Sequence, residues 1–274
     1  MNRIENAFKH KPIFMPYFPL GYPDLDTSID VIEALARNGA DLIEVGLSFS
    51  DPFADGPVIQ KATQVALEKG ITVKKSLAAV AELRKRGVTI PLVLMGYYNP
   101  MLAYGLEKFV RDAVDVGADG FIVPDLPMEE AQEFQLALSG ASTSPTAPLS
   151  AIPLIQMLAP TSPNERMELI ARNAKGFIYL VSVTGVTGAR SSISDGLGDL
   201  IARVRERAKQ SVPVCVGFGI STPEQAAQVG ALADGVIVGS ACVKTIGESQ
   251  NPVEAAKEFA QKFGDTLIMI RTAK

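Results

Sequence analysis

The sequence predicts an α/β protein with a single (βα)8 TIM barrel and extra helices. Short apolar runs alternate with helical patterns along the chain, which is typical of a parallel sheet built from βα units. A length of 274 residues suits one barrel as well as two small domains. Because eight successive βα units can be counted, we expect one barrel domain over residues 1–274.

The strands are expected in eight apolar runs, at 13–20, 40–46, 91–97, 119–123, 152–158, 176–182, 212–217 and 235–238. Helical patterns lie between and after them, at 27–38, 58–69, 73–86, 106–116, 128–138, 164–173, 197–209, 223–229 and 252–263. Residues 139–150 are rich in Ser, Thr, Ala and Pro. Since the βα alternation resumes directly afterwards, we interpret this segment as a surface insertion on the barrel face opposite the active site.

The composition excludes several classes of function. The formal net charge is −4, and hydrophobic residues make up 47% of the chain, so no basic surface for nucleic acid or anionic membrane is predicted. The sequence shows no signal-peptide pattern and no apolar run of membrane-spanning length, and a cytoplasmic protein is expected. His10 is the single histidine, while Cys215 and Cys242 are expected to be buried, reduced thiols.

The stretch 42–60 (L-I-E-V-G-L-S-F-S-D-P-F-A-D-G-P-V-I-Q) holds the strongest functional candidates. Glu44 interrupts an apolar strand, where a carboxylate must be desolvated or paired. Asp51 and Asp55 follow in the loop after that strand. Two carboxylates in different environments can divide acid and base work. Asp-Pro and Asp-Gly are also ordinary turn formers, so the loop alone leaves both readings open.

Three glycine-rich turns follow the sixth, seventh and eighth predicted strands, at 184–190, 217–221 and 239–241. In barrels of this kind these positions often bind phosphate, because glycine lets backbone N–H groups approach an anion. Tight turns without a ligand are the alternative. No predicted strand carries a lysine for a Schiff base and no metal cluster is evident. A short helix capped by Ser240 is expected after the eighth strand, and its N-terminus would favour a negative charge. Lys244 lies in that helix and is interpreted as surface charge. Carboxylate acid–base chemistry therefore has the best support.

Five motifs resemble, in order, those of the tryptophan synthase alpha subunit: P-Y-F-P-L-G-Y-P-D, I-E-V-G-L-S-F-S-D-P-F-A-D-G-P-V-I-Q, V-P-D-L-P, Y-L-V-S-V-T-G-V-T-G and G-F-G-I-S. The resemblance covers nearly the whole chain, from residue 13 to about residue 246. It implies retro-aldol cleavage of indole-3-glycerol phosphate to indole and glyceraldehyde 3-phosphate. Protonated at C3, indole can leave with the electron pair, so a carbon–carbon lyase of this type needs no Schiff base.

The resemblance also implies roles for individual residues. Glu44, Asp55 and Tyr179 match the family's catalytic positions. Matches to its substrate-binding positions are Tyr17, Met95, Ile122, Thr187 and Phe218, and matches to its phosphate-binding positions are Gly188, Gly219, Gly239 and Ser240. The family implies no metal and no cofactor in this chain. It further implies a beta subunit carrying pyridoxal phosphate (PLP), in an α2β2 heterotetramer.

The sequence departs from the family pattern at three places. Pro19 stands where threonine is common, Ser48 replaces a frequent proline, and the 139–150 segment is longer. Two alternatives stay open. One is another phosphate-binding TIM-barrel enzyme, such as a phosphoribosyl isomerase or an indole-glycerol-phosphate synthase. The other is a barrel that mainly binds and activates a PLP beta subunit.

Overall fold

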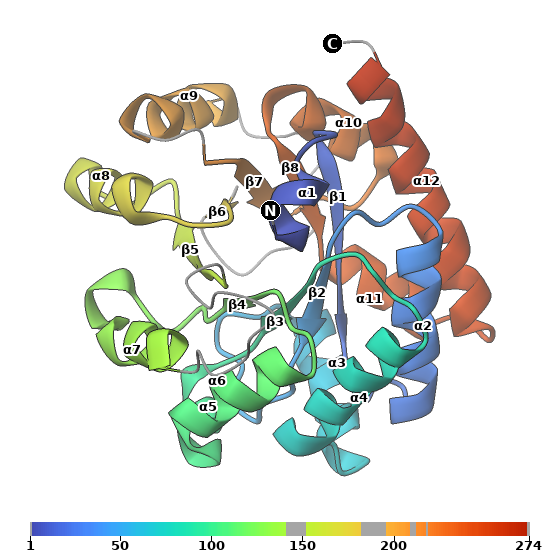
Figure 1. The fold of residues 1–274 in the computed structure, drawn as a ribbon. Coiled ribbons are helices and arrows are strands. Elements are labelled where there is room, and N and C mark those ends of the chain that lie inside the picture. Colours follow the sequence, from blue (N-terminus) through green and yellow to red (C-terminus); the bar gives the residue numbers. More distant parts are fainter. Residues whose placement is uncertain (1, 141–151, 182–195, 209–211, 218, 273–274) are drawn as a thin grey trace.

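A computed structural model describes residues 2–140, 152–181, 196–208, 212–217 and 219–272 of the chain. Eight parallel strands form a closed barrel in sequence order, in which β8 pairs with β1 (Figure 1). The strands are β1 Ile13–Pro19, β2 Ile43–Gly46, β3 Leu92–Met95, β4 Gly120–Ile122, β5 Leu154–Leu158, β6 Ile178–Val181, β7 Val214–Gly217 and β8 Gly235–Val238. The predicted (βα)8 TIM barrel is confirmed, although most strands are shorter than their apolar runs.

Helices surround the barrel in the order that the sequence predicts, with two additions. They are α1 Arg3–Ala7, α2 Leu25–Arg37, α3 Pro57–Glu68, α4 Val73–Lys85, α5 Tyr98–Tyr104, α6 Leu106–Asp115, the 3-10 helix η1 Met128–Glu130, α7 Gln132–Gly140, α8 Asn164–Asn173, α9 Leu197–Arg207, α10 Pro223–Leu232, α11 Ser240–Gly247 and α12 Pro252–Thr272. Helices α1 and α5 were not expected. Both are short, and α1 depends on a capping box between Asn2 and Glu5. The single helix expected at 128–138 is wrong, because η1 and α7 divide it.

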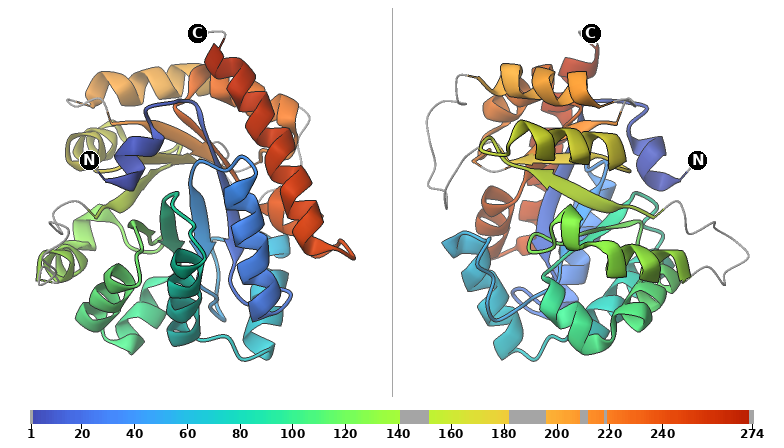
Figure 2. Two further views of the ribbon diagram at one scale, coloured as in Figure 1. Left: turned by 45° about the vertical axis from the view of Figure 1, so that its right-hand side comes forward. Right: turned by 90° about the vertical axis from the view of Figure 1, so that its left-hand side faces the viewer.

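The last helix is longer than predicted. It was expected to end at residue 263 but continues to Thr272. Its buried positions Phe259, Phe263 and Leu267 follow the i, i+4 spacing of one helix face. Near its C-terminal end, Arg271 pairs with Asp41. Figure 2 shows α12 lying along α2 and α10, the helices with which it packs.

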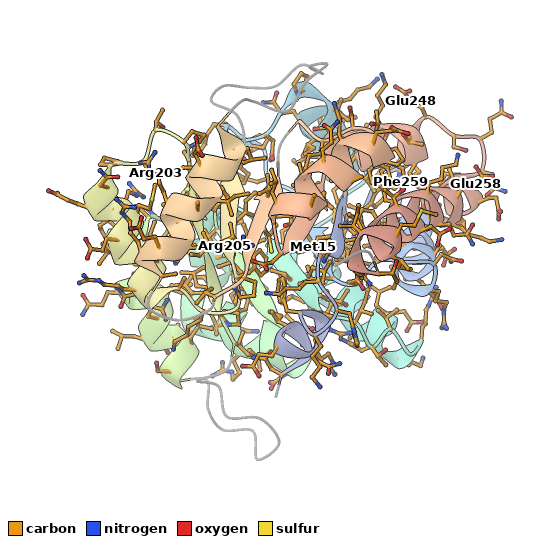
Figure 3. The ribbon with its side chains drawn as sticks, turned by 90° about the horizontal axis from the view of Figure 1, so that it is seen from above. Met15, Arg203, Arg205, Glu248, Glu258 and Phe259 are labelled. Carbon is orange, nitrogen blue, oxygen red and sulfur yellow. The ribbon has the colours of Figure 1, made fainter. Side chains whose placement is uncertain are left out.

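The barrel interior and the helix layer form the core. Neighbouring strands place residues in register, so that Tyr17 pairs with Glu44 and Met157 pairs with Tyr179. Residues in register on adjacent parallel strands point to the same face. Met15 lies near the middle of the molecule, whereas Glu258 on α12 points outward to solvent (Figure 3). No helix in the described ranges has the length and apolar character needed to cross a membrane.

Aspartates hold the N-terminal ends of the strands together. Asp41, which precedes β2, accepts a hydrogen bond from the Phe14 N–H of β1 at 2.7 Å. Asp119 and Asp234 do the same for the first N–H groups of β3 and β7, at 2.9 and 3.0 Å. Each also pairs with an arginine: Arg271, Arg84 and Arg205, respectively. The end of the barrel opposite the predicted active site is thus held by charge-assisted contacts.

Candidate active site

The predicted catalytic strand residues lie inside the barrel. Tyr17 on β1, Glu44 on β2 and Tyr179 on β6 are all buried and line one cavity. Two glycines allow the tyrosines to lie there. A Cβ atom at Gly46 would collide with the Tyr17 hydroxyl, and a Cβ atom at Gly217 would collide with the Tyr179 hydroxyl. Both strand-end positions therefore exclude any larger residue.

The carboxyl group of Glu44 is buried inside the barrel. It is 1% exposed, and its Oε1 has no hydrogen-bond partner within the described part of the chain. Burial raises the pKa of Glu44 from its ordinary 4.5 to about 8, because a charged carboxylate is disfavoured away from water. At neutral pH this carboxyl group is mostly protonated. It can therefore donate a proton into the cavity.

Asp55 lies on the loop between β2 and α3, which has a well-defined geometry. The Asp55 N–H donates to the Pro52 carbonyl at 3.0 Å, and the Asp55 carbonyl accepts from the Gln60 side chain at 2.9 Å. Gly56 then serves as the N-cap of α3, with Pro57 at the first helical position. These contacts fix the backbone at Asp55, and the residue, although on a loop, is only 6% exposed.

Tyr97 is a functional candidate that the sequence did not reveal. Its hydroxyl donates to Asp55 Oδ2 at 3.0 Å and accepts from the Ala54 N–H at 3.0 Å. Its ring also lies 5.4 Å from that of Phe53 on the same loop. Burial raises the pKa of Asp55 from 3.8 to about 6, and the hydrogen bond from Tyr97 limits that rise. Tyr97 thus both positions the Asp55 carboxylate and stabilises its charge.

The cavity has a volume of about 520 Å³ and brings most of the predicted residues together. Its lining includes Tyr17, Glu44, Asp55, Met95, Tyr179, Gly219, Gly239 and Ser240. Ile122 is buried on β4 in register with Met95, but it is not among the lining residues. Thr187, Gly188 and Phe218 lie outside the described residues, as does the insertion predicted at 139–150, apart from its first two residues. Apolar walls come from Val58, Ile59, Ile220 and Ile237.

One end of the cavity is suited to an anion. Gly239 is the N-cap of α11 and Ser240 is its first residue, so the sequence interpretation of Ser240 as the cap was wrong by one position. The N–H groups of the first turn have no partners within the helix and carry partial positive charge. Gly219, with φ of +80°, lies in the adjacent turn after β7. Lys244 is exposed, as predicted, but it also lines this cavity.

The position of Tyr97 leads to a first prediction. Changing Tyr97→Phe keeps the ring against Phe53 but removes the hydrogen bond to Asp55. We expect kcat to fall by roughly tenfold, because a hydrogen bond to a charged group is lost. The pKa of Asp55 should rise, and the acid limb of the kcat–pH profile should therefore shift to higher pH. The kcat–pH profile measures both effects.

Tyr98→Phe is the matched control for this change. Tyr98 is the next residue, and its hydroxyl donates to Glu133 on α7 at 3.3 Å. Its loss should leave kcat and the profile unchanged. An unchanged acid limb in Tyr97→Phe would show that Tyr97 does not act on Asp55.

Fold and site together define a class of protein: a (βα)8-barrel enzyme with two carboxyl groups of different pKa in one cavity that a helix N-terminus also lines. A family model described as "Tryptophan synthase alpha chain" matches residues 5–268. The chain belongs to the tryptophan synthase alpha chain family, whose alpha subunit acts as a lyase in tryptophan biosynthesis.

Individual relatives agree with this assignment. A tryptophan synthase alpha chain of Chloroflexus aggregans is 46% identical, over 89% of each chain. One of Dehalococcoides mccartyi is 42% identical, over 97% of this chain and 100% of its own. The structure of Mycobacterium tuberculosis tryptophan synthase superposes with a TM-score of 0.85 at 35% identity, covering 97% of this chain and 98% of that one.

Proposed function

We propose that this chain cleaves indole-3-glycerol phosphate to indole and glyceraldehyde 3-phosphate, with Glu44 and Asp55 as the acid–base pair. The observation that carries this proposal is the separation of two pKa values in one cavity. The pKa of Glu44 is about 8 and that of Asp55 about 6. At pH 7 the first group is mostly protonated and the second mostly ionised, which divides acid from base.

The proposed reaction has two steps. First, Glu44 gives its proton to C3 of the indole while Asp55 takes the proton from the ring nitrogen. Next, the Glu44 carboxylate takes the proton of the hydroxyl on the carbon attached to C3, and the carbon–carbon bond breaks. Its electron pair returns to the ring, and Asp55 gives the nitrogen its proton back. The products are indole and an aldehyde, and both carboxyl groups end as they began.

The remaining candidates would bind the substrate. The apolar walls and Met95 suit the indole, with Ile122, Phe218 and Thr187 assigned by their match to the family. Tyr179 lies on β6, and Tyr17 lies in register with Glu44. The phosphate would bind the first turn of α11 at Gly239 and Ser240, together with Gly219 and Gly188. Burial raises the pKa of both tyrosines, so their hydroxyls stay neutral hydrogen-bonding groups.

A change at Gly239 tests the phosphate site. Among the described residues, a Cβ atom there would meet ordinary contacts, 3.7 Å from Ile59 and 3.8 Å from Tyr17, and the backbone φ is −97°. Gly239→Val should therefore fold but block the approach of phosphate to the backbone. We expect KM to rise about tenfold or more, with a smaller effect on kcat, and competition by inorganic phosphate to weaken.

Gly198→Ala on α9 provides a matched glycine control. A Cβ atom there meets only Leu232, at 4.0 Å, and should change neither KM nor inhibition. Gly219 is less suitable for this test, because its positive φ would strain any replacement. Undiminished phosphate competition in Gly239→Val would place the phosphate elsewhere.

We further propose that the chain acts with a beta subunit in an α2β2 assembly and that PLP belongs to that subunit alone. The test of the whole proposal is an assay of indole release from indole-3-glycerol phosphate, with and without the cognate beta subunit. Release of indole and aldehyde in equal amounts is expected. Absence of release in both conditions would contradict the proposed reaction.

A further inference from the structure

We propose that Lys244 is a phosphate-positioning residue, which neutralises substrate charge from the side of α11. This inference rests on the proposed function. Lys244 lines the same cavity as Glu44 and Asp55, and it is the only Lys or Arg among the lining residues that the structure describes. No ion pair engages its ammonium group within the described residues. A dianionic phosphate entering beside two carboxyl groups needs a positive charge nearby.

The geometry of α11 directs Lys244 toward the predicted phosphate site. Ser240 and Lys244 are four residues apart, so they lie one above the other on one helix face. Cα–Cβ bonds in a helix tilt toward its N-terminus, and long side chains lie over the preceding turn. In that general orientation the ammonium group of Lys244 would extend toward the first turn of α11, where the N–H groups have no partners within the helix. The N-terminus of α11 and the positive charge of Lys244 would then act on the same anion.

The neighbouring charge on this helix face is Glu248, the C-cap of α11, which also lines the cavity. Figure 3 shows Glu248 at the edge of the molecule. Along the helix axis, Glu248 lies about 12 Å from Ser240, whereas Lys244 lies about 6 Å from it. At physiological salt a charge beyond roughly 8 Å is largely screened. Lys244 should therefore dominate the local potential, and Glu248 should have little effect.

The experiment compares Lys244→Met with Lys244→Arg in the complex with the cognate beta subunit. For Lys244→Met we expect KM to rise about three- to tenfold, the range of one partly exposed charge contact. The change in kcat should be less than twofold, since the group does not touch the reacting atoms. The decrease of kcat/KM with added salt should become shallower. Lys244→Arg keeps the charge and should restore most of the wild-type KM.

Two controls separate a local role from general charge. Lys74→Met removes an exposed lysine on α4, outside the cavity, and should leave KM unchanged. Glu248→Gln removes one negative charge from the helix face that carries Lys244, and it should change KM by less than twofold. An effect of Glu248→Gln as large as that of Lys244→Met would overturn the local role. A KM of Lys244→Met within twofold of wild type would also overturn it.

Direct anion binding distinguishes failure of this inference from failure of the proposed reaction. The dissociation constant of inorganic phosphate can be measured by calorimetry on the chain without any turnover. Lys244→Met should weaken phosphate binding about three- to tenfold, and Lys74→Met should not. If the wild-type chain bound phosphate through Lys244 but released no indole, the reaction would be wrong and the site would stand. Equal phosphate affinity in wild type and Lys244→Met would refute the site.

Discussion

Glu44→Gln and Asp55→Asn should each reduce indole release by about 100- to 10,000-fold. Both substitutions keep the size of the side chain and remove its ability to transfer a proton. Glu44→Gln loses the acid at C3, and Asp55→Asn loses the base at the ring nitrogen. Single-turnover measurements in the complex with the beta subunit would show whether the chemical step itself has slowed. Near-normal activity in either variant would remove that residue from the mechanism.

The same Glu44 variant should be more stable than the wild type at high pH. A carboxyl group with a folded pKa of about 8 keeps its proton in the folded chain, whereas the unfolded chain releases it above about pH 4.3. Wild-type stability should therefore fall as the pH rises from about 4.3 to 8. Glu44→Gln removes this dependence, for a gain on the order of a few kcal/mol at pH 8. Thermal unfolding at pH 5 and pH 8 measures it.

Glu107→Gln is the control for both measurements. Glu107 is an exposed residue in the first turn of α6, and its change should alter neither turnover nor the pH dependence of unfolding. A stability difference between Glu44→Gln and wild type that stayed constant from pH 5 to pH 8 would contradict a buried, neutral Glu44.

Binding of a cognate beta subunit should raise turnover of this chain by about 10- to 100-fold, by selecting the catalytic arrangement of the loop after β2. The loop carries a large exposed apolar group, since Phe53 is 68% exposed while its ring lies against Tyr97. Asp51 and Pro52 adjoin it. A partner covering Phe53 would press on Tyr97, which holds Asp55. Phe53→Ser should therefore reduce both affinity and activation about tenfold or more.

Met269→Ser provides the comparison for Phe53→Ser. Met269 is exposed to nearly the same extent, 69%, but it lies near the C-terminal end of α12, at the other end of the barrel from α3 (Figure 1). It should not affect the response to the beta subunit. Tight binding with unchanged turnover would rule out activation. No binding at all would point to a stand-alone lyase.

Local sequence patterns predicted the barrel, and they also singled out the two carboxyl groups that the structure places in one cavity. An acidic residue inside an apolar strand is visible without a structure, and burial of Glu44 follows from the continuous apolar run around it. The motif around Asp55 contains its own turn and helix start, so its loop geometry is also local. Strand ends were predicted too long, because apolar residues continue past the last ladder hydrogen bond. The end of α12 was predicted too early, because the helix continues where it packs against α2 and α10.

Contacts between distant segments could not be predicted in this way. Tyr97 and Asp55 are 42 positions apart, and nothing near Tyr97 indicates a hydroxyl aimed at a carboxylate. A tyrosine at the end of the third predicted strand was the available signal, because the C-terminal ends of all strands meet at one face of a barrel. The position of Lys244 beside the cavity also depends on distant segments. Its exposure was predicted from its helix, but the cavity beneath that helix depends on how the barrel closes.

The aspartates at the N-terminal strand ends imply that the barrel is modular, with a strand pair as its unit. Ala-Asp stands before β2, β4 and β8, and in each case the carboxylate joins an even strand to the odd strand preceding it. Each of these aspartate contacts joins two positions within one βαβ segment, so the entropic cost of closing the chain between them is small. Before β6 the corresponding dipeptide is Ala174-Lys175, which has no carboxylate. Three of the four strand pairs thus carry an aspartate contact of their own, whereas β5 and β6 are joined by their ladder without one.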